Sequence, residues 1–409
     1  MIITCSTRDA RFDIGTQAGS DAVHKNPRYS YAVTLLRDAH GREGSGLAFT
    51  LGTGNDLVSR VAELLAEKLV GREIEELMAD FGSIQRQLSD DPQLRWLGPH
   101  KGVVHLALAS VTNACWDLWA KTQGRPLWRL LLDLTPSQLV ATLDLSYLED
   151  ALSAEQARGI IKSETPGRDA RMRILKTGYP GYDTSIGWFN YSDAQVAENV
   201  RRSVAAGFTA LKLKVGSPDM SVDLRRAALV RSEAGASATL MVDCNQQWNV
   251  TRALEFGERT RDLNLYWIEE PTHPDDICAH ATLARAYAPH TKVAAGEHLP
   301  NRVVFKNYFQ LKALGFCQVD AVRVAGISEF ITVSLLARQF CIPVVPHVGD
   351  MGQIHQHLVI FNHVALGHDA VLLEHIPHLS RHFKHPCVVK EGVYRTPEEP
   401  GMSADLLPD

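Results

Sequence analysis

The chain has 409 residues, a formal net charge of −5 and 45% hydrophobic residues, which is ordinary for a globular protein with one large or two smaller domains. This charge argues against a nucleic-acid-binding protein and against attraction to an anionic membrane. Seven cysteines without a CxxC pair indicate reduced thiols, and the first residues lack the pattern of a signal peptide. We therefore expect a soluble cytoplasmic protein with neither nucleic acid nor a membrane as partner.

The first third of the chain is predicted to form an α+β domain. The segment YSYAVTLLRDAHGREGSGLAFTLG has the pattern of a β-hairpin that turns near His40 and Gly41. The segment VVHLALASVTNACWDLWAK is apolar on nearly all sides, which predicts a buried helix. A polar segment over about 150–195 is expected to connect this domain to the next one. The expected elements are strands over 2–12 and 29–37 and helices over about 57–70, 73–89 and 103–122.

From about residue 195 the chain alternates short apolar runs with helix-length amphipathic segments. The runs are ALKLKVG, TLMVDCN, LYWIEEP, KVAAGEH, FCQVDAVR, IPVVPHVG and VLLEHIP. Such alternation is typical of repeated βα units on a parallel sheet, and seven or eight units favour a closed (β/α) barrel. The predicted fold class is therefore α/β, a modified TIM-type barrel with an amino-terminal α+β domain.

One ionisable residue stands at the end of each apolar run. Taken alone, such a residue is more often a helix cap or a solvated loop residue than a catalyst. In a barrel, however, the carboxyl ends of the strands surround one mouth, so residues at seven successive strand ends converge. The residues are Lys214, Asp243, Glu269, Glu297, Asp320, His347 and Glu374, separated by 23 to 29 positions.

Three acids on successive strands indicate a metal site. Asp243, Glu269 and Glu297 would form an all-oxygen set suited to Mg²⁺, whereas zinc more often recruits histidine or cysteine. A cation would also explain how Glu269 can be buried at a strand end. The adjacent Glu270 either forms an ion pair or lies just beyond the metal ligands.

A base and an acid are predicted on either side of these carboxylates. The alternation in LKLK places Lys212 and Lys214 on one face of a strand, where two ammonium groups beside a metal would lower each other's pKa. Asp320, one strand before His347, can orient its imidazole. In isolation, solvated lysines and a core histidine would be the simpler explanation. Together, these groups favour proton abstraction next to a metal-bound carboxylate.

The same residues carry a family resemblance. The segments KLKVG, VDCNQQW, WIEEPTHPDD, AAGEH, VDAVRVAG and PHVG resemble the enolase superfamily, in its mandelate-racemase-type branch. Longer segments over nearly the whole chain, among them RYSYAVTLLR, QLRWLGPHKGVVHLA, YPGYDTSIGW and LEHIPHLSRHF, resemble the L-fuconate dehydratases of that superfamily. The resemblance implies a homo-oligomeric hydro-lyase of carbohydrate catabolism that takes a small acid sugar.

The resemblance also implies a division of the chain and a ligand set. Residues 1–137 would form the capping domain, 138–380 the barrel with the catalytic site, and 381–409 a segment that returns to the cap. Asp243, Glu269 and Glu297 would bind Mg²⁺, with Asn245 in or near that ligand set.

The implied reaction is dehydration to a 2-keto-3-deoxy sugar acid. Lys214 would remove the C2 proton, and Lys212 would help to hold the substrate carboxylate. His347, oriented by Asp320, would protonate the departing 3-hydroxyl, while Glu374 would lie near the enolate on the far side. A racemase, epimerase or dehydratase of another hydroxy acid is the alternative within the superfamily. A barrel without activity that binds a ligand is the alternative from another class.

Several residues near the predicted site have less certain roles. His298 directly follows Glu297 and is a candidate for substrate binding. Asp350 stands where the family has glycine, in the loop after His347, and this leaves the substrate preference open. His355 and His357 resemble a metal pair but are expected to be packing or surface residues.

Overall fold

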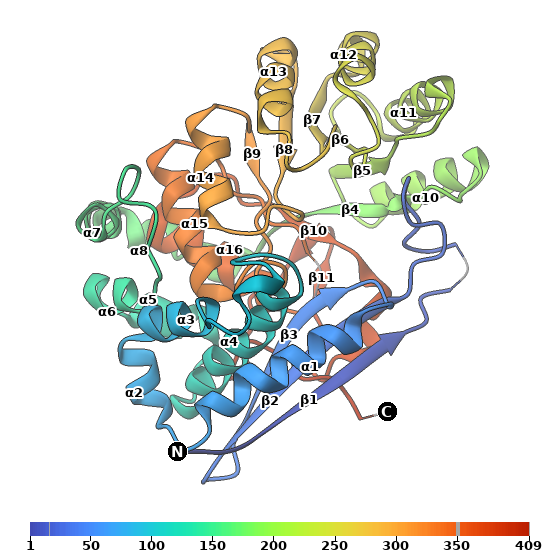
Figure 1. Ribbon diagram of the computed structural model, residues 1–409. Helices are drawn as coiled ribbons and strands as arrows, with labels where there is room; N and C mark the ends of the chain where they lie inside the picture. The colour runs from blue at the N-terminus through green and yellow to red at the C-terminus, as the bar shows by residue number, and fades with distance from the viewer. Residues whose placement is uncertain (16, 349–351, 409) are drawn as a thin grey trace.

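The computed structural model describes residues 1–15, 17–348 and 352–408. An amino-terminal sheet with its helices lies against a larger ring of strands and helices (Figure 1). No helix in the described ranges is long and apolar enough to cross a membrane.

The amino-terminal part contains a three-stranded antiparallel sheet in the order β1-β2-β3. The predicted hairpin is confirmed, because β2 pairs with β3 across a turn in which Gly41 has a φ of 79°. The predicted helix over 73–89 is interrupted at Asp80, whose φ of −140° leaves the helical region. The elements are β1 Ile2–Phe12, β2 Tyr29–Asp38, β3 Glu43–Thr50, α1 Asn55–Ala66, α2 Ile74–Ala79, α3 Phe81–Ser89 and α4 Gly102–Thr122.

Helix α4 is the buried helix that its apolar sequence predicts, and it packs directly on β3. This contact depends on glycine, since a Cβ on Gly46 would lie 1.9 Å from the carbonyl oxygen of Ser110 and one on Gly44 would lie 2.4 Å from that of Ala114. Other polar residues of α4, including Thr112 and Trp116, reach the barrel. Because Thr112 donates to the carbonyl of Ala325 at 2.8 Å, this helix joins the two parts of the molecule.

The segment predicted to be a polar connection contains regular structure. It includes helix α7 (Ala154–Ser163) and the first barrel strand, β4 (Tyr179–Gly187), so the prediction for 150–195 is wrong. The strand was not predicted because proline and glycine, which stand at Pro180 and Gly181, are more typical of turns than of strands. Here Gly181 is needed in the strand, since its added Cβ would lie 2.9 Å from the ring of Tyr394.

The remaining strands follow in spatial order and form a modified (β/α) barrel, which confirms the predicted fold class (Figure 1). β10 pairs in parallel with β4 and joins the last unit to the first. The run IPVVPHVG forms only a parallel bridge between Cys317 and Val344 rather than a strand. The strands are β5 Ala210–Lys214, β6 Thr239–Asp243, β7 Leu265–Glu269, β8 Lys292–Ala295, β9 Phe316–Cys317 and β10 Leu373–His375. The outer helices are α10 Asp193–Ala205, α11 Met220–Ala234, α12 Val250–Arg259, α13 Ile277–Tyr287, α14 Arg302–Gln310, α15 Ile327–Gln339 and α16 Ile354–Leu366.

Large side chains fill the amino-terminal end of the barrel. Tyr182, Trp267 and Phe316 belong to a separate buried cluster there, and the rings of Tyr182 and Trp267 meet edge to face with centroids 5.6 Å apart. This packing leaves the carboxyl ends of the strands as the mouth at which polar groups can gather.

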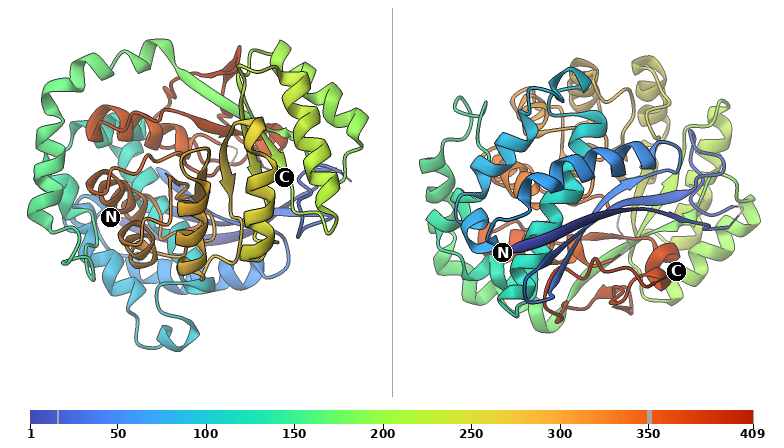
Figure 2. Two further views of the ribbon diagram at one scale, coloured as in Figure 1. Left: turned by 90° about the horizontal axis from the view of Figure 1, so that it is seen from above. Right: turned by 60° about the horizontal axis from the view of Figure 1, so that its bottom comes forward.

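The carboxyl-terminal segment contacts both parts of the molecule (Figure 2). The hairpin of β11 (Val389–Lys390) and β12 (Val393–Tyr394) pairs with β4 of the barrel. Further along, the amide of Met402 donates to Asp117 of α4 at 2.7 Å. These contacts locate the segment after residue 380, while the domain limits at 137 and 380 stay predictions.

Candidate active site

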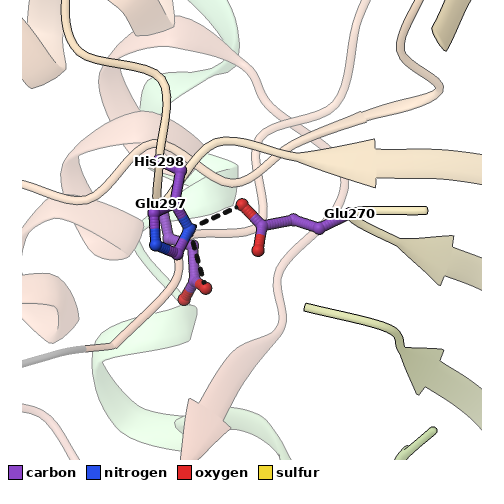
Figure 3. Close-up of side chains that lie close together, drawn as sticks. All are labelled: Glu270, Glu297 and His298. Atoms are coloured by element: carbon purple, nitrogen blue, oxygen red, sulfur yellow. Dashed lines mark hydrogen bonds and ion pairs between the residues drawn. The ribbon is translucent and has the colours of Figure 1, made fainter. Parts of the chain in front are cut away.

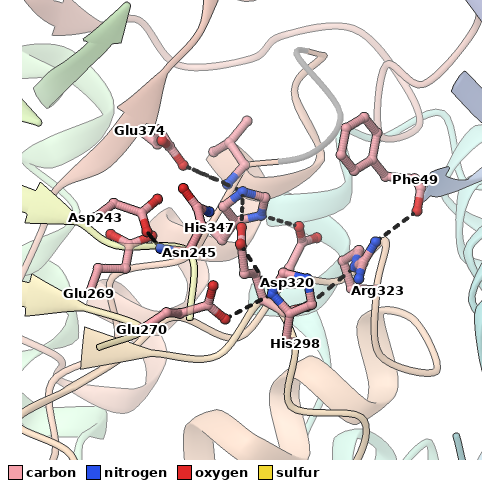
Figure 4. A network of polar contacts seen from close by, with 12 residues as sticks. Phe49, Asp243, Asn245, Glu269, Glu270, His298, Asp320, Arg323, His347 and Glu374 are labelled. Atoms are coloured by element: carbon pink, nitrogen blue, oxygen red, sulfur yellow. Dashed lines mark hydrogen bonds and ion pairs between the residues drawn. The ribbon is translucent and has the colours of Figure 1, made fainter. Parts of the chain in front are cut away.

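Strand register brings the first three predicted site residues side by side. Lys214 is paired with Asp243, and Asp243 with Glu269, across the carboxyl ends of β5, β6 and β7. Glu297 and Asp320 follow β8 and β9 by a few residues, so they reach the same mouth. The convergence expected from the spacing is therefore present, and Figure 4 shows its members Asp243, Glu269, Asp320, His347 and Glu374 close together.

Lys212 is buried among carboxylates. Its Nζ donates to Glu269 at 2.9 and 3.0 Å and lies 2.9 Å from Glu374. Trp267 donates a further hydrogen bond to Glu269 through its indole nitrogen at 3.0 Å. Burial opposes the charge of Lys212, but Glu269 and Glu374 outweigh it and raise the lysine pKa well above its ordinary value.

Lys214 occupies the neighbouring position on the same face of β5. Its Nζ lies 2.5 Å from Asp243 and 3.3 Å from the side-chain oxygen of Asn245. Burial lowers the pKa of Lys214, yet Asp243 outweighs both burial and Lys212, so the pKa is raised. Without a metal charge, the nearby carboxylates contribute more to the pKa of Lys214 than the repulsion between the two lysines does, and the lowered pKa expected beside a bound metal stays a prediction.

A second polar group lies across the carboxylates from the lysines. His347 contacts Asp320 through Nδ1 at 2.7 Å and Glu297 through Nε2 at 2.5 Å, and its Nε2 lies 3.9 Å from Glu374 (Figure 4). Burial opposes the charge of His347, but Glu297 and Asp320 raise its pKa well above the ordinary value. The predicted pairing of His347 with Asp320 is therefore present in the geometry.

Glu270 forms the ion pair that was one of its two predicted roles. The Nδ1 atom of His298 lies 2.8 Å from Glu270 and 3.2 Å from Glu297 (Figure 3). Burial opposes the charge of His298, but the two carboxylates raise its pKa to about 10. Gln246 adds a hydrogen bond to Glu270 at 2.7 Å.

These contacts affect which residues converge as metal ligands. Among the described residues, the group whose ligand atoms lie within 4.8 Å of one another is Glu270, Glu297 and His298, rather than the predicted Asp243, Glu269 and Glu297. The difference arises because Glu297 is turned toward His298 and His347 here, while Lys212 and Lys214 contact the other two acids.

The carboxylate set nevertheless fits a divalent cation. Six acids gather at the mouth with two lysines and two histidines, so the carboxyl groups outnumber these four cationic or protonatable groups. Burial, reinforced by Asp243 and Glu374 and opposed by Lys212, raises the pKa of Glu269 to about 8. Oxygen ligands in such surplus suit Mg²⁺ rather than zinc. The acids are Asp243, Glu269, Glu270, Glu297, Asp320 and Glu374.

Three non-glycine residues beside the site have left-handed backbone conformations. The φ angles are 45° at Asn245, 65° at Gln246 and 42° at Glu270. This region costs energy for a residue with a Cβ, and such strain concentrates at functional sites. Hydrogen bonds hold the conformation, including one from the amide of Gln246 to the carbonyl of Glu270 at 2.8 Å.

Residues of the amino-terminal part cover the mouth and complete a cavity. No motif marks these residues, because half of them lie in an irregular segment before β2 and the others lie in or next to the strands of the amino-terminal sheet. Asp21 and His24 contact each other at 3.0 Å, and Tyr29 follows them at the start of that strand. Trp188 also lines this cavity, and the wall residues that sequence reasoning missed are Gly19, Asp21, His24, Tyr29, Phe49, Leu51, Arg323 and Ile376.

Arg323 connects the two parts at this cavity. Its guanidinium donates to the carbonyl of Glu297 at 3.2 Å and to that of Phe49 at 3.3 Å (Figure 4). Asp350, the sequence departure after His347, lies outside the described residues. Of the two histidines expected to be packing or surface residues, His357 is buried and accepts from the amide of Trp128, whereas His355 contacts Asp320.

Two family descriptions match the chain. The mandelate racemase / muconate lactonizing enzyme N-terminal domain matches residues 16–131, and the enolase C-terminal domain-like family matches residues 195–409. The chain belongs to the enolase superfamily, in its mandelate racemase branch. The predicted superfamily is thus confirmed.

Individual relatives cover nearly the whole chain. The crystal structure of human mitochondrial enolase superfamily member 1 is 40% identical, covers 99% of this chain and 94% of that chain, and has a TM-score of 0.96. L-galactonate dehydratase of Hypocrea jecorina is 38% identical over 98% of this chain and 91% of its own. L-talarate/galactarate dehydratase of Salmonella typhimurium, solved with Mg and L-lyxarohydroxamate, is 27% identical, covers 99% and 90% of the two chains, and has a TM-score of 0.79.

Proposed function

We propose that this protein is a Mg²⁺-dependent dehydratase of acid sugars that acts on L-fuconate or a close relative. The observation that carries the proposal is the placement of Lys214 and the His347–Asp320 pair on opposite sides of one buried carboxylate cluster. The names of two relatives, L-galactonate dehydratase and L-talarate/galactarate dehydratase, support the substrate class.

Asp243, Glu269 and Glu297 would hold Mg²⁺, with Asn245 beside them. Bound there, the ion supplies positive charge that stabilises the negative charge developing on the substrate carboxylate as the C2 proton leaves. The excess of carboxylates and the raised pKa of Glu269 support this assignment.

The protein's own residues account for both proton transfers. Lys214 takes the C2 proton in its neutral form, which a cation bound beside Asp243 would favour by offsetting the carboxylate that raises the lysine pKa. The ammonium group of Lys212 helps to hold the substrate carboxylate. His347, held by Asp320 through Nδ1, gives its Nε2 proton to the 3-hydroxyl, which leaves as water. Glu374 lies between Lys212 and His347 and borders the enolate. Tautomerisation of the resulting enol gives the 2-keto-3-deoxy acid.

The cavity wall supports a polyhydroxylated substrate. His24, Tyr29, His298 and Arg323 present hydrogen-bonding groups around the cavity, and a site built this way rejects analogues that lack the matching hydroxyls. We extend the proposal to a homo-oligomeric cytoplasmic enzyme.

A second candidate is inversion at C2 by a racemase or epimerase. It is favoured by the same observation, because Lys214 and His347 lie on opposite sides of the site and could deliver and remove a proton from opposite faces. Loss of water separates the two reactions. We do not propose an inactive barrel, because the sequence keeps a residue of the expected type at each position proposed for the base, the acid and the metal ligands.

The test is a screen of five- and six-carbon aldonic acids, including L-fuconate and L-galactonate, for 2-keto acid formation with Mg²⁺. Lys214→Ala and His347→Asn are compared with Lys176→Ala and His290→Asn, which change exposed residues of the same types. We expect turnover in the wild type and both controls and none in the two site variants. If no acid gives keto acid but C2 exchanges in D₂O, the racemase alternative replaces the dehydratase.

A further inference from the structure

Asp320 contacts a second histidine that the proposed reaction does not use. His355 lies in the first turn of α16 and is 1% exposed. Its Nε2 atom is 2.9 Å from Oδ1 of Asp320, while Oδ2 of the same carboxylate contacts His347 at 2.7 Å. Asp320, itself fully buried, therefore bridges two imidazole rings.

We assign the contact as a hydrogen bond that Nε2 of His355 donates to Asp320. The amide of Ala321 also points at Nε2 of His355, at 3.1 Å, and would require that nitrogen to be unprotonated. An unprotonated Nε2 would then face a carboxylate oxygen at 2.9 Å, and two acceptors at this distance repel each other. A proton on Nε2 removes the repulsion and makes a charge-assisted bond, which is stronger than the neutral alternative.

This bond limits how Asp320 can rotate. Oδ1 accepts from His355 and from the amide of Val322 at 2.8 Å, which leaves Oδ2 for Nδ1 of His347. With Nδ1 occupied, the His347 ring keeps its Nε2 toward the cavity, where the departing hydroxyl of the proposed reaction would lie. Without His355, one donor would remain on Oδ1 and the carboxylate could turn.

We propose that His355 is a positioning residue for the dehydration step, holding Asp320 so that His347 is aimed at the departing 3-hydroxyl. The inference rests on the proposed function. It concerns the proton donated to the leaving group and not the proton removed from C2, because Lys214 lies on the other side of the carboxylates and has no contact with Asp320 among the described residues.

Because His355 is proposed to affect only one of the two proton transfers, the two can be measured separately. A general loss of structure would lower both. His355→Leu removes the donor, and His355→Gln keeps an N–H that can reach the carboxylate. His357→Gln is the matched control, since His357 is equally buried on the same helix but contacts Trp128 instead. Each variant is assayed with Mg²⁺ for 2-keto acid formation and, in D₂O, for deuterium at C2 of recovered substrate.

We expect His355→Leu to lower kcat for elimination about 10- to 100-fold with KM within about twofold, the range for residues that orient a ligand or catalytic group from behind. Exchange at C2 should persist, so the ratio of exchange to elimination rises. His355→Gln should recover part of the loss, and His357→Gln should behave as the wild type. Equal falls in exchange and elimination, or unchanged elimination, would overturn the inference.

A second measurement does not depend on turnover. The proton between Nδ1 of His347 and Asp320 should give a downfield NMR resonance in the wild type that is lost in His347→Asn. We expect it to move upfield or broaden in His355→Leu and to be retained in His357→Gln. A wild type that forms no 2-keto acid would reject the proposed function, whereas an unchanged resonance in His355→Leu would reject the positioning role.

Discussion

The side-chain amide of Asn113, on the buried helix α4, donates a hydrogen bond of 2.9 Å to the carbonyl of Ala321, the residue that follows Asp320. The same side chain donates to the carbonyl of Leu47 at 3.2 Å and accepts from the amide of Ile327 at 3.0 Å. One residue of the cap thus holds a strand of its own sheet, the middle of the loop that carries Asp320, and the start of α15, where that loop ends.

Replacing Asn113 with alanine should weaken both stability and turnover. The substitution leaves three buried backbone groups without this partner, and each such loss costs roughly 1–3 kcal/mol. We expect a fall in the free energy of unfolding of at least about 1 kcal/mol by urea titration, together with a lower kcat for elimination. Asn307→Ala is the control, because this half-buried residue makes no side-chain hydrogen bond within the described ranges. Unchanged turnover in Asn113→Ala would show that the hydrogen bonds of Asn113 to this loop are not needed for catalysis.

Tyr29→Phe should change substrate recognition rather than folding. The hydroxyl of Tyr29 lies at the cavity wall, and within the described ranges no residue forms a hydrogen bond with it. Losing one hydrogen bond to a substrate hydroxyl costs about 0.5–1.5 kcal/mol, which corresponds to a KM raised about 2- to 10-fold. The readouts are KM for each active acid sugar and the midpoint of thermal unfolding, which should stay the same. An unchanged KM for every substrate would remove Tyr29 from the recognition surface.

Glu329 should make stability depend on acid pH. It is buried with His105 of α4 at 3.0 Å and accepts from the amide of Arg302 at 2.8 Å. Burial alone would raise its pKa, but His105 and Arg302 outweigh burial and lower the pKa from 4.5 to about 2. A lowered folded pKa stabilises the protein above the unfolded value, and this stabilisation, about 3 kcal/mol, is lost as pH falls from about 4.5 to about 2.

Urea unfolding between pH 6 and pH 2.5 tests this dependence. Glu329→Gln should be less stable than the wild type at pH 6, and the difference should shrink as the pH falls. Glu198→Gln, at an exposed position, should follow the wild-type curve. A constant difference between Glu329→Gln and the wild type across the range would contradict the assignment.

Mg²⁺ should stabilise the folded protein through the carboxylate cluster. At 100 times the dissociation constant, a ligand that binds only the folded state adds about 2.7 kcal/mol. We expect thermal unfolding to shift upward with Mg²⁺ and to return to its starting value with chelator. Glu269→Gln should lose most of this shift, and Asp262→Asn, an exposed acid, should retain it. A full shift in Glu269→Gln would place the ion elsewhere.

The barrel and the positions of its polar residues could be predicted because each apolar run stops at an ionisable side chain. Pairing of neighbouring parallel strands then places Lys214, Asp243 and Glu269 side by side, independently of the conformation of the loops. The strand at Tyr179–Gly187 could not be predicted in this way, since Gly181 is explained only by the rings of Tyr394 and Phe208, which come from other segments of the chain.

The residues that cover the cavity, and the contacts that set the pKa values in the site, could be identified only from the folded structure. Tyr29 is separated from the barrel by more than a hundred residues, and nothing local marks it as part of a cavity wall. His355 resembles a core histidine until its distance to Asp320 is known. The sequence shows that Lys214 has a neighbouring lysine, but the 2.5 Å contact with Asp243, which raises the pKa of Lys214, is known only from the folded arrangement.

The carboxyl-terminal contacts with α4 have a consequence for assembly on the ribosome. Met402, Ser403 and Ala404 are buried, the amide of Met402 is bonded to Asp117, and Lys121 contacts Asp405 at 2.9 Å. Residues 402–405 are synthesised after every strand of the barrel, whereas α4, which they contact, emerges early. The first domain to leave the ribosome therefore completes its packing last, and the site that it covers is finished only after translation has passed residue 405.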